Sequence, residues 1–234
     1  MQDEILKHTK KIYNEVKSPK HTFGEKVKEI IIEILIIVFA VTLSIWLHSW
    51  SEERHQQKEA QTFLISLKED LKNDISNLEN TQKILNQTRQ QISFILNLTP
   101  EKIDSIKANH QQINSGTNFI NTIANNGRYE GFKSSGKINT IEDENLRNKI
   151  LSYYQQTIPQ ISLIETSFEK LTSRYVDLLM GGKEDEDINT NLLNKRTKII
   201  LSGINNFTKF NQKSYEDAIK DAESIIKTID ANEK

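Results

Sequence analysis

One stretch of the chain is apolar on every side and lies close to the N-terminus. From Ile30 to Trp50 it runs 21 residues with a single charged side chain, Glu33. At about 1.5 Å per helical residue, this length crosses roughly the 30 Å hydrocarbon layer of a bilayer. A core helix of a soluble protein is the weaker alternative, because no polar face appears between Ile34 and Leu43. No small-x-small cleavage site follows, so we predict a retained transmembrane signal anchor over residues 30–50.

Lysine and arginine are distributed unequally on the two sides of this run. Seven lysines precede it, whereas the first 20 residues after it contain only Arg54, Lys58 and Lys68. Positive side chains near a membrane helix concentrate on the cytoplasmic side. We therefore predict that residues 1–29 form a short Lys-rich cytoplasmic segment and that residues 51–234 lie outside the cytoplasm.

Two tryptophans mark the far end of the run. Trp46 and Trp50 stand one helical turn apart. Tryptophan is enriched at the level of the lipid headgroups, where its ring is amphipathic. We expect these two side chains to anchor the outer interface.

A stripe of polar and small side chains follows one side of the predicted span. Its members fall within about 80° of one another at 100° per residue; they are Glu33, Ile37, Ala40, Ser44 and His48. Small residues let helix backbones approach closely in lipid, and ionisable groups there usually face protein or water. One interpretation is a packing face for a partner helix. The other is that Glu33 lies about one turn inside the boundary and reaches the headgroups beside Lys26 and Glu29.

Beyond the span a heptad pattern predicts one long helix over residues 51–97. The apolar members of the first seam position are Leu64, Leu71, Leu78, Leu85 and Ile92. The companion position holds Leu67 and Ile95 at its ends but Asp74, Thr81 and Thr88 between them. A seam that is only half apolar suits a helix in an antiparallel bundle better than a free-standing coiled coil.

The remaining sequence predicts an all-α fold. Residues 98–139 are irregular, with short helical patterns at Glu101–Ala108 and Asn118–Asn125 and a glycine-containing loop after them. Thr140 is expected to cap a second long helix, 141–180, which Pro159 should kink. A third long helix is expected at about 189–230, after an acidic connector. Together these elements predict an up-and-down bundle of about four elements with long antiparallel helices.

Composition removes several function classes. The chain carries 31 basic and 32 acidic residues, a formal net charge of −1, spread without a concentrated basic face. That distribution argues against binding to nucleic acid. The sequence contains no cysteine, which excludes disulfides, zinc thiolate sites and a cysteine nucleophile.

Three motifs contain side chains that could carry chemistry. Glu52-x-x-His55 has the spacing of carboxylate-bridged metal helices, but the chain has no second copy of it. The stretch Lys133–Lys137 could bind an anion, although it lacks the phosphate-loop pattern and a structural turn is favoured. The connector GGKEDEDIN lacks the oxygen spacing of a calcium loop. We expect no catalytic residues, no metal and no cofactor.

Several short stretches resemble one family in their order along the chain. They are Glu33-Ile34, Trp50 to Arg54, Phe63 to Ile75, Lys133 to Lys137, Leu146-Arg147 and Tyr153-Tyr154. Together they resemble a family of uncharacterised single-span membrane proteins common in Bacteroidota. The family usually has Gly at the place of Ala40 and Asn-Asn-Trp-Asn where this chain reads His48-Ser49-Trp50-Ser51. The resemblance implies a Gram-negative inner-membrane protein with a periplasmic domain, and it implies no activity.

These observations lead to one expected function and two alternatives. We expect a non-enzymatic, membrane-anchored accessory or scaffold subunit that contacts the lipid bilayer and either forms a homo-oligomer or binds another inner-membrane protein. The first alternative is a periplasmic sensor whose bundle binds a small ligand or a peptidoglycan fragment. The second is an enzyme using a metal at the outer interface.

Overall fold

A computed structural model describes residues 6–11, 13, 23–114, 116, 118, 120, 124–181 and 188–232. These ranges contain helices and connecting segments and no β-strand, which confirms the predicted all-α class. The chain divides into two compact units, Met1–Glu59 and Ala60–Lys234. The second unit is called the helical domain below.

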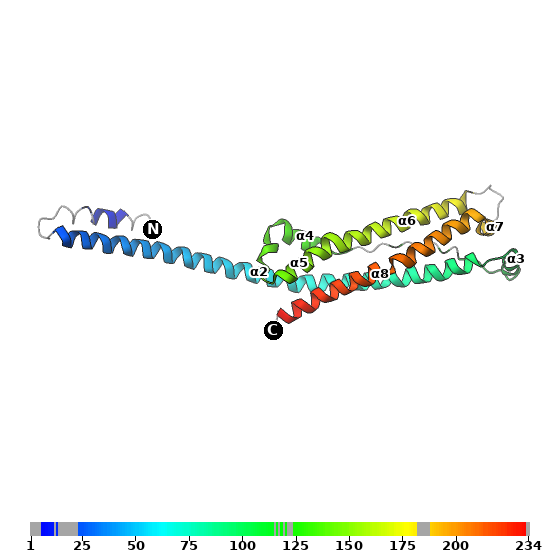
Figure 1. Ribbon diagram of the computed structural model, residues 1–234, viewed down its shortest axis with the longest axis horizontal. Coiled ribbons are helices and arrows are strands. Elements are labelled where there is room, and N and C mark those ends of the chain that lie inside the picture. The colour runs from blue at the N-terminus through cyan, green and yellow to red at the C-terminus, as the bar shows by residue number, and fades with distance from the viewer. Residues whose placement is uncertain are drawn as a thin grey trace. The chain divides into compact units, whose positions relative to one another are not determined.

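Helix α2, Phe23–Leu96, contributes to both units (Figure 1). The sequence between Gly24 and Pro100 contains neither glycine nor proline, so no residue in it breaks the helical hydrogen-bond ladder. The predicted span 30–50 and the predicted helix 51–97 are therefore consecutive parts of one helix. In the described part of the chain, α2 is the one helix that is long and apolar enough to cross a membrane.

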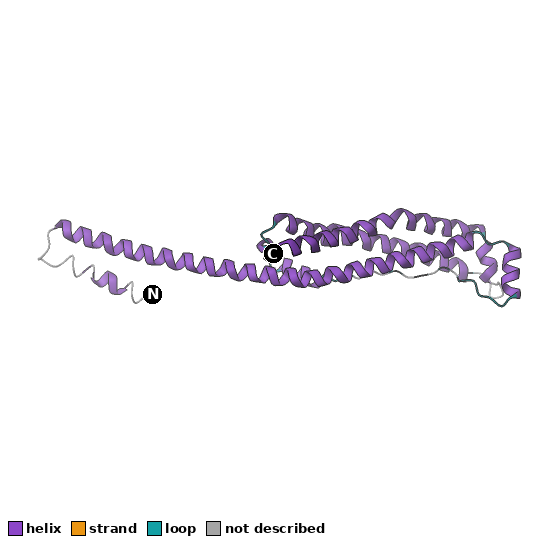
Figure 2. Cartoon of the chain, turned by 90° about the horizontal axis from the view of Figure 1, so that it is seen from below, coloured by secondary structure: helices purple, strands orange, loops and turns teal. Residues whose placement is uncertain are grey.

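Two further long helices, α6 (Ile158–Met180) and α8 (Lys195–Asn232), complete the helical domain. Side-chain contacts fix the direction of α8 against α2: Lys68 with Asp230, Arg89 with Gln212, and Lys198 with the carbonyl oxygen of Leu96. Partners later in α2 meet residues earlier in α8, so this pair is antiparallel. Thr157 with Asp221 and Glu165 with Tyr215 show the same for α6 and α8. Figure 2 shows these helices side by side.

Because both α2 and α6 are antiparallel to α8, they run in the same direction, and the chain has to return between them. After α3, Pro100–Ala108, it does so largely without a helix. We call residues 111–126, as far as they are described, the return segment. Gly116 lies against Ile92, Asn118 bonds Thr88 and Asn125 bonds Asp74, so this segment runs antiparallel to α2. The predicted helical pattern at Asn118–Asn125 is wrong, since its described members are not helical.

The core of the helical domain forms two clusters along these helices. One contains Leu78, Leu85, Ile92, Phe168, Leu201 and Tyr215 among its buried members. The other contains Leu67, Leu71, Tyr129, Tyr153, Ala222 and Ile225. Buried positions on α8 recur at sevens, at Leu201, Thr208, Tyr215, Ala222 and Ile229. This spacing keeps one face of α8 on its neighbours throughout its length.

Short elements join the return segment to α6, and they correct the predicted boundaries. Helix α4, Gly127–Ser134, occupies a stretch that the sequence indicated to be a loop. The 3-10 helix η1, Lys137–Thr140, follows Gly136, whose φ of 75° favours glycine. Helix α5, Glu144–Ser152, is capped by the Asp143 carboxylate, which accepts from the Leu146 N–H, and not by Thr140. The Thr140 hydroxyl instead donates to the carbonyl of Lys137.

The predicted disturbance at Pro159 takes the form of a widened helical turn. Residues Tyr153–Thr157 form a π-helical turn, η2, between α5 and α6. Proline has no N–H to donate to the residue four positions earlier, so the α-helical ladder cannot continue regularly through it. The π-helical turn places the irregularity immediately before Pro159.

The predicted third long helix, 189–230, is two helices. Helix α7 is Ile188–Leu193, Asn194 follows it, and α8 begins at Lys195. The Asn194 side chain accepts from the Arg196 N–H at 2.9 Å. Asparagine competes in this way with the backbone ladder and starts a new helix. The acidic connector before α7 lies outside the described residues, apart from its ends.

Candidate functional site, a buried carboxylate and tyrosine cluster

The predicted packing face on α2 differs in burial from one end to the other. Ala40, Ser44 and His48 are exposed, Ile37 is half-buried, and Glu33 is buried. The Glu33 Oε1 lies 2.9 Å from Nδ1 of His8, which belongs to the short helical stretch 6–11. Neither interpretation of Glu33 includes this contact, because a separation of 25 residues gives no sequence signal. The role of the face in binding a partner stays a prediction.

The two predicted anchor tryptophans are exposed on α2. The guanidinium carbon of Arg54 lies 4.3 Å from the centre of the Trp50 ring, within cation–π range. The next residue, His55, lies 3.6 Å from Glu59, and Glu52 accepts from Gln56. Within the described residues, no group of three or more His, Asp or Glu side chains is placed to hold a metal ion.

The predicted seam is buried along most of its own length. Leu71, Leu78, Leu85 and Ile92 are buried, but Leu64 is only half-buried, and Phe63 is buried beside it. A straight helix drifts about 20° per heptad, so a strict seven-residue pattern rotates away from a fixed neighbour. At this end the ring of Phe63 stacks on Phe132 of α4 at 4.0 Å between centroids.

The polar seam positions are buried as well, and the return segment supplies partners for two of them. Thr88 accepts from the Asn118 side-chain amide at 2.9 Å. Asp74 accepts from the Asn125 backbone N–H at 3.0 Å. Thr81 is buried on the same seam. A non-helical segment carries backbone N–H groups that are free to bond, which explains why this seam is not apolar throughout.

Asp70 and Asp74 lie at the centre of what we call the carboxylate and tyrosine cluster, together with Tyr129, Tyr153 and Tyr154. Each carboxylate is 1% exposed. The Asp70 Oδ1 accepts from the Asn125 side chain at 2.8 Å and lies 3.2 Å from Nη1 of Arg128. The Asp74 Oδ2 accepts from the Tyr153 hydroxyl at 3.3 Å. The cluster therefore joins α2, the return segment, α4 and η2.

The three tyrosine rings pack closely on one another. Tyr129 stacks on Tyr154 with 4.4 Å between centroids, and Tyr153 meets Tyr154 edge-on at 5.0 Å. The Tyr129 hydroxyl accepts from the Gln155 side chain at 2.8 Å. Buried aromatic pairs of this kind add about 0.5–1.5 kcal/mol each beyond their area.

Burial dominates the electrostatics of the cluster. Loss of solvation raises the pKa of Asp70, and the Arg128 guanidinium only partly offsets it. Loss of solvation also raises the pKa of Asp74, against the two hydrogen bonds that favour its charged form. The pKa of Tyr153 is raised far above its usual value by burial and by the charge of Asp74. Tyr153 therefore acts as a neutral hydroxyl donor to Asp74, whose own pKa is raised.

The hydrogen bonding within the cluster is incomplete. The Asp70 Oδ2 and the Tyr154 hydroxyl are buried and have no hydrogen-bond partner in the described part of the chain. An unmatched polar atom inside a protein costs about 1–3 kcal/mol. The heptad pattern identifies Asp74 only as a polar seam position. The signal for the whole cluster was a charged residue between Leu71 and Leu78, which requires a polar partner from another segment.

Comparison with known proteins gives one match. A family model described as "Family of unknown function (DUF6090)" matches residues 33–174, and this range contains every member of the cluster. Searches of curated proteins and of solved structures found no match to the chain.

Proposed function

We propose that this chain, which belongs to the DUF6090 family of unknown function, is a membrane-anchored accessory or scaffold subunit of an inner-membrane or envelope complex. In this proposal it is not an enzyme. The observation that supports it most is the exposure of the apolar run on α2. Leu35 is 60% exposed and Phe39 is 68% exposed, and most large side chains from Ile31 to Trp50 are similarly open.

This exposure is unfavourable in water. Covering a large apolar side chain contributes about 1.5–3 kcal/mol, so a run of such residues needs lipid or protein around it. The hydroxyl groups in the run suit lipid, because Thr42 donates to Val38 O and Ser44 donates to Ala40 O within the same helix. A hydroxyl bonded in this way leaves no donor unsatisfied in hydrocarbon.

The lysine distribution supports an orientation with the N-terminus in the cytoplasm and the helical domain in the periplasm. A test is to fuse alkaline phosphatase after residue 60 in a Gram-negative host, with a fusion after residue 24 as the control. We expect activity only from the fusion after residue 60, because this phosphatase folds outside the cytoplasm. An inactive fusion after residue 60 would contradict the orientation.

The face of Glu33, Ile37, Ala40, Ser44 and His48 supports binding to a second membrane helix, in a homo-oligomer or in another inner-membrane protein. Small side chains at Ala40 and Ser44 allow close approach of two backbones. The test introduces a photo-crosslinking residue at Ala40 or Ser44 in native membranes. Matched controls carry it at Leu35 or Phe39, which lie on the opposite side of α2.

We expect protein adducts from Ala40 and Ser44 and mainly lipid adducts from Leu35 and Phe39. The mass of the adduct separates a second copy of the chain from a different partner. Lipid adducts alone at both Ala40 and Ser44 would overturn the packing role of this face.

A further inference from the structure

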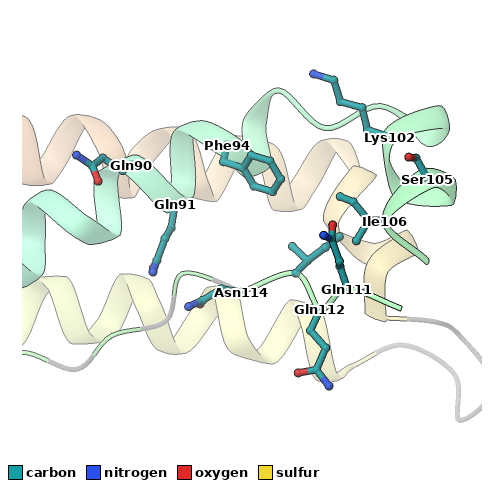
Figure 3. Close-up of a pocket in the computed structure, with 10 residues that line it drawn as sticks. Gln90, Gln91, Phe94, Lys102, Ser105, Ile106, Gln111, Gln112 and Asn114 are labelled. Carbon is teal, nitrogen blue, oxygen red and sulfur yellow. The ribbon is translucent and has the colours of Figure 1, made fainter. Parts of the chain in front are cut away.

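A pocket of about 610 Å³ lies where α2 ends, α3 begins and the return segment starts (Figure 3). It belongs entirely to the helical domain. The lining residues are Gln90, Gln91, Phe94, Lys102, Ser105, Ile106, Gln111, Gln112, Ile113 and Asn114. A pocket of this size fits a small organic ligand of two or three rings.

Side-chain amides make up much of the pocket lining. Four glutamines and one asparagine contribute primary amides, Ser105 contributes a hydroxyl, and no carboxylate is present among these residues. Each amide offers two donors and one acceptor and carries no charge. Such a lining suits a neutral ligand with many hydroxyl groups, whose neighbouring O–H groups both donate and accept.

One amide presents an unmatched atom. The Oε1 of Gln91 is buried and has no hydrogen-bond partner in the described ranges. A buried acceptor in this state costs about 1–3 kcal/mol. Because solvent does not reach this atom, it belongs to the inner wall of the pocket and is not itself a contact for a ligand. The Asn114 Oδ1 is already used by the Gly116 N–H at 3.0 Å, so its NH₂ group is the part left to donate.

An aromatic ring adds a flat apolar surface. Phe94 is 52% exposed, and Figure 3 shows its ring facing Ile106 and Gln111 across the pocket. An exposed ring of this kind on a polar pocket is a platform for the C–H face of a sugar ring. Lys102, the one cation among the described lining residues, donates to the Asn97 carbonyl at 3.2 Å and points away from Asn114 in Figure 3.

The local backbone fixes the pocket before any ligand arrives. The Thr99 side chain caps α3 by accepting from the Lys102 N–H, and Pro100 begins that helix. His110 then adopts a left-handed φ of 52°, and the Gln111 N–H donates to the Ile106 carbonyl. Gly116, at φ 72°, brings the return segment against Gln91. A preformed site loses less conformational entropy on binding.

We propose that this pocket binds a neutral oligosaccharide. The exposed amides of Gln111, Gln112 and Asn114 bond its hydroxyl groups, and the Phe94 ring packs on one sugar face. Among the lining residues that the structure describes there is no carboxylate to hold a cation, and the Lys102 ammonium group points away from Asn114, so the amide-lined part of the pocket carries no charge (Figure 3). The inference goes beyond the anchoring role and does not depend on it.

The test uses the full-length protein in a detergent without a sugar headgroup, such as an amine oxide, because maltoside headgroups would compete. Saturation-transfer NMR is recorded with two neutral probes, maltotriose and the trimer of N-acetylglucosamine, and with tetra-alanine as a peptide probe. The variant Phe94→Ala is compared with Phe210→Ala, an 85% exposed phenylalanine on α8 that is absent from the lining.

We expect at least one saccharide to bind and Phe94→Ala to weaken it about tenfold, the loss of a stacking contact worth about 1.4 kcal/mol. Phe210→Ala should bind as the parent does. The proposal is overturned if neither saccharide binds, if only the peptide binds, or if both variants lose binding equally.

Discussion

The carboxylate and tyrosine cluster and the amide pocket both lie along α2, about five helical turns apart. They differ in whether neighbouring segments cover the polar side chains of α2. At Asp74 the return segment and η2 supply hydrogen bonds, and the site is closed. At Gln91 the same segment only begins, and the space beside it stays open. The comparison teaches that one connecting segment determines where this helix is sealed and where it is accessible.

The largest expected effect is the loss of stability when the buried cluster loses the Asp74 carboxylate. Replacing Asp74 with leucine leaves the Asn125 N–H and the Tyr153 hydroxyl buried without their acceptor. We expect the free energy of unfolding to fall by about 2–4 kcal/mol. Denaturant unfolding of the full-length protein in detergent, followed by circular dichroism, measures it.

The matched control for that change is Asp104→Leu, on the exposed surface of α3. A substitution there should change stability by no more than about 0.5 kcal/mol. Equal losses in the two variants would show that the Asp74 contacts contribute nothing specific.

The second effect is a pH dependence carried by the cluster. Because the folded pKa values of Asp70 and Asp74 lie above the unfolded value of 3.8, the folded state binds protons first as the pH falls. Their contribution to stability therefore declines as pH rises through the window above 3.8. Asp143, whose pKa is lowered by Asn232 and the Leu146 N–H, acts in the opposite direction.

Asp74→Asn isolates the cluster from such background groups, since its oxygen can still accept from Asn125 and its amide can donate to Tyr153. Subtracting its stability profile between pH 4 and pH 7 from that of the parent should leave a difference that falls with rising pH. A flat difference would mean that Asp74 has the same pKa folded and unfolded.

A smaller effect is expected where the return segment bonds the seam through one contact. Thr88→Val removes the acceptor of the Asn118 amide and should cost about 1 kcal/mol. A double-mutant cycle with Asn118→Ala should give a coupling energy of about 0.5–1.5 kcal/mol. Additive losses would contradict a direct bond between the two side chains.

The smallest effect is expected at the pocket. Phe94→Ala removes a half-exposed ring, so the free energy of unfolding should change by less than about 1 kcal/mol. The melting temperature of the variant in detergent measures this change. A loss as large as that of Asp74→Leu would place Phe94 in the core and would remove the contrast between the two regions.

Periodic patterns predicted the helical class and the end of α2, but not the interruptions within the two later helices. The all-α class is confirmed, α2 ends within one residue of the predicted boundary, and four of the five seam residues are buried. These features depend on helical repeats that recur over many turns, so an error at one position matters little. The prediction of a buried Leu64 was wrong because the neighbouring side chain, Phe63, packs on Phe132, a partner far away in the sequence.

Single residues with several roles were predicted poorly. Thr140 and Asp143 are both good helix caps by type, and only the position of the following turn decides between them. Asn194 divides the last predicted helix by a local side-chain bond. The carboxylate and tyrosine cluster and the amide pocket both require the return segment, whose course along α2 leaves no periodic signal.

The pairing of α2 with α8 has a consequence for biosynthesis. Lys68 and its partner Asp230 are 162 residues apart. At about 5–20 residues per second, a ribosome needs roughly 8–30 s to make the chain between them. During that time Leu71, Leu78 and Leu85 have no α8 to cover them. The apolar face of α2 is therefore complete long before its last partner helix exists, so this part of the core can form only after synthesis of α8.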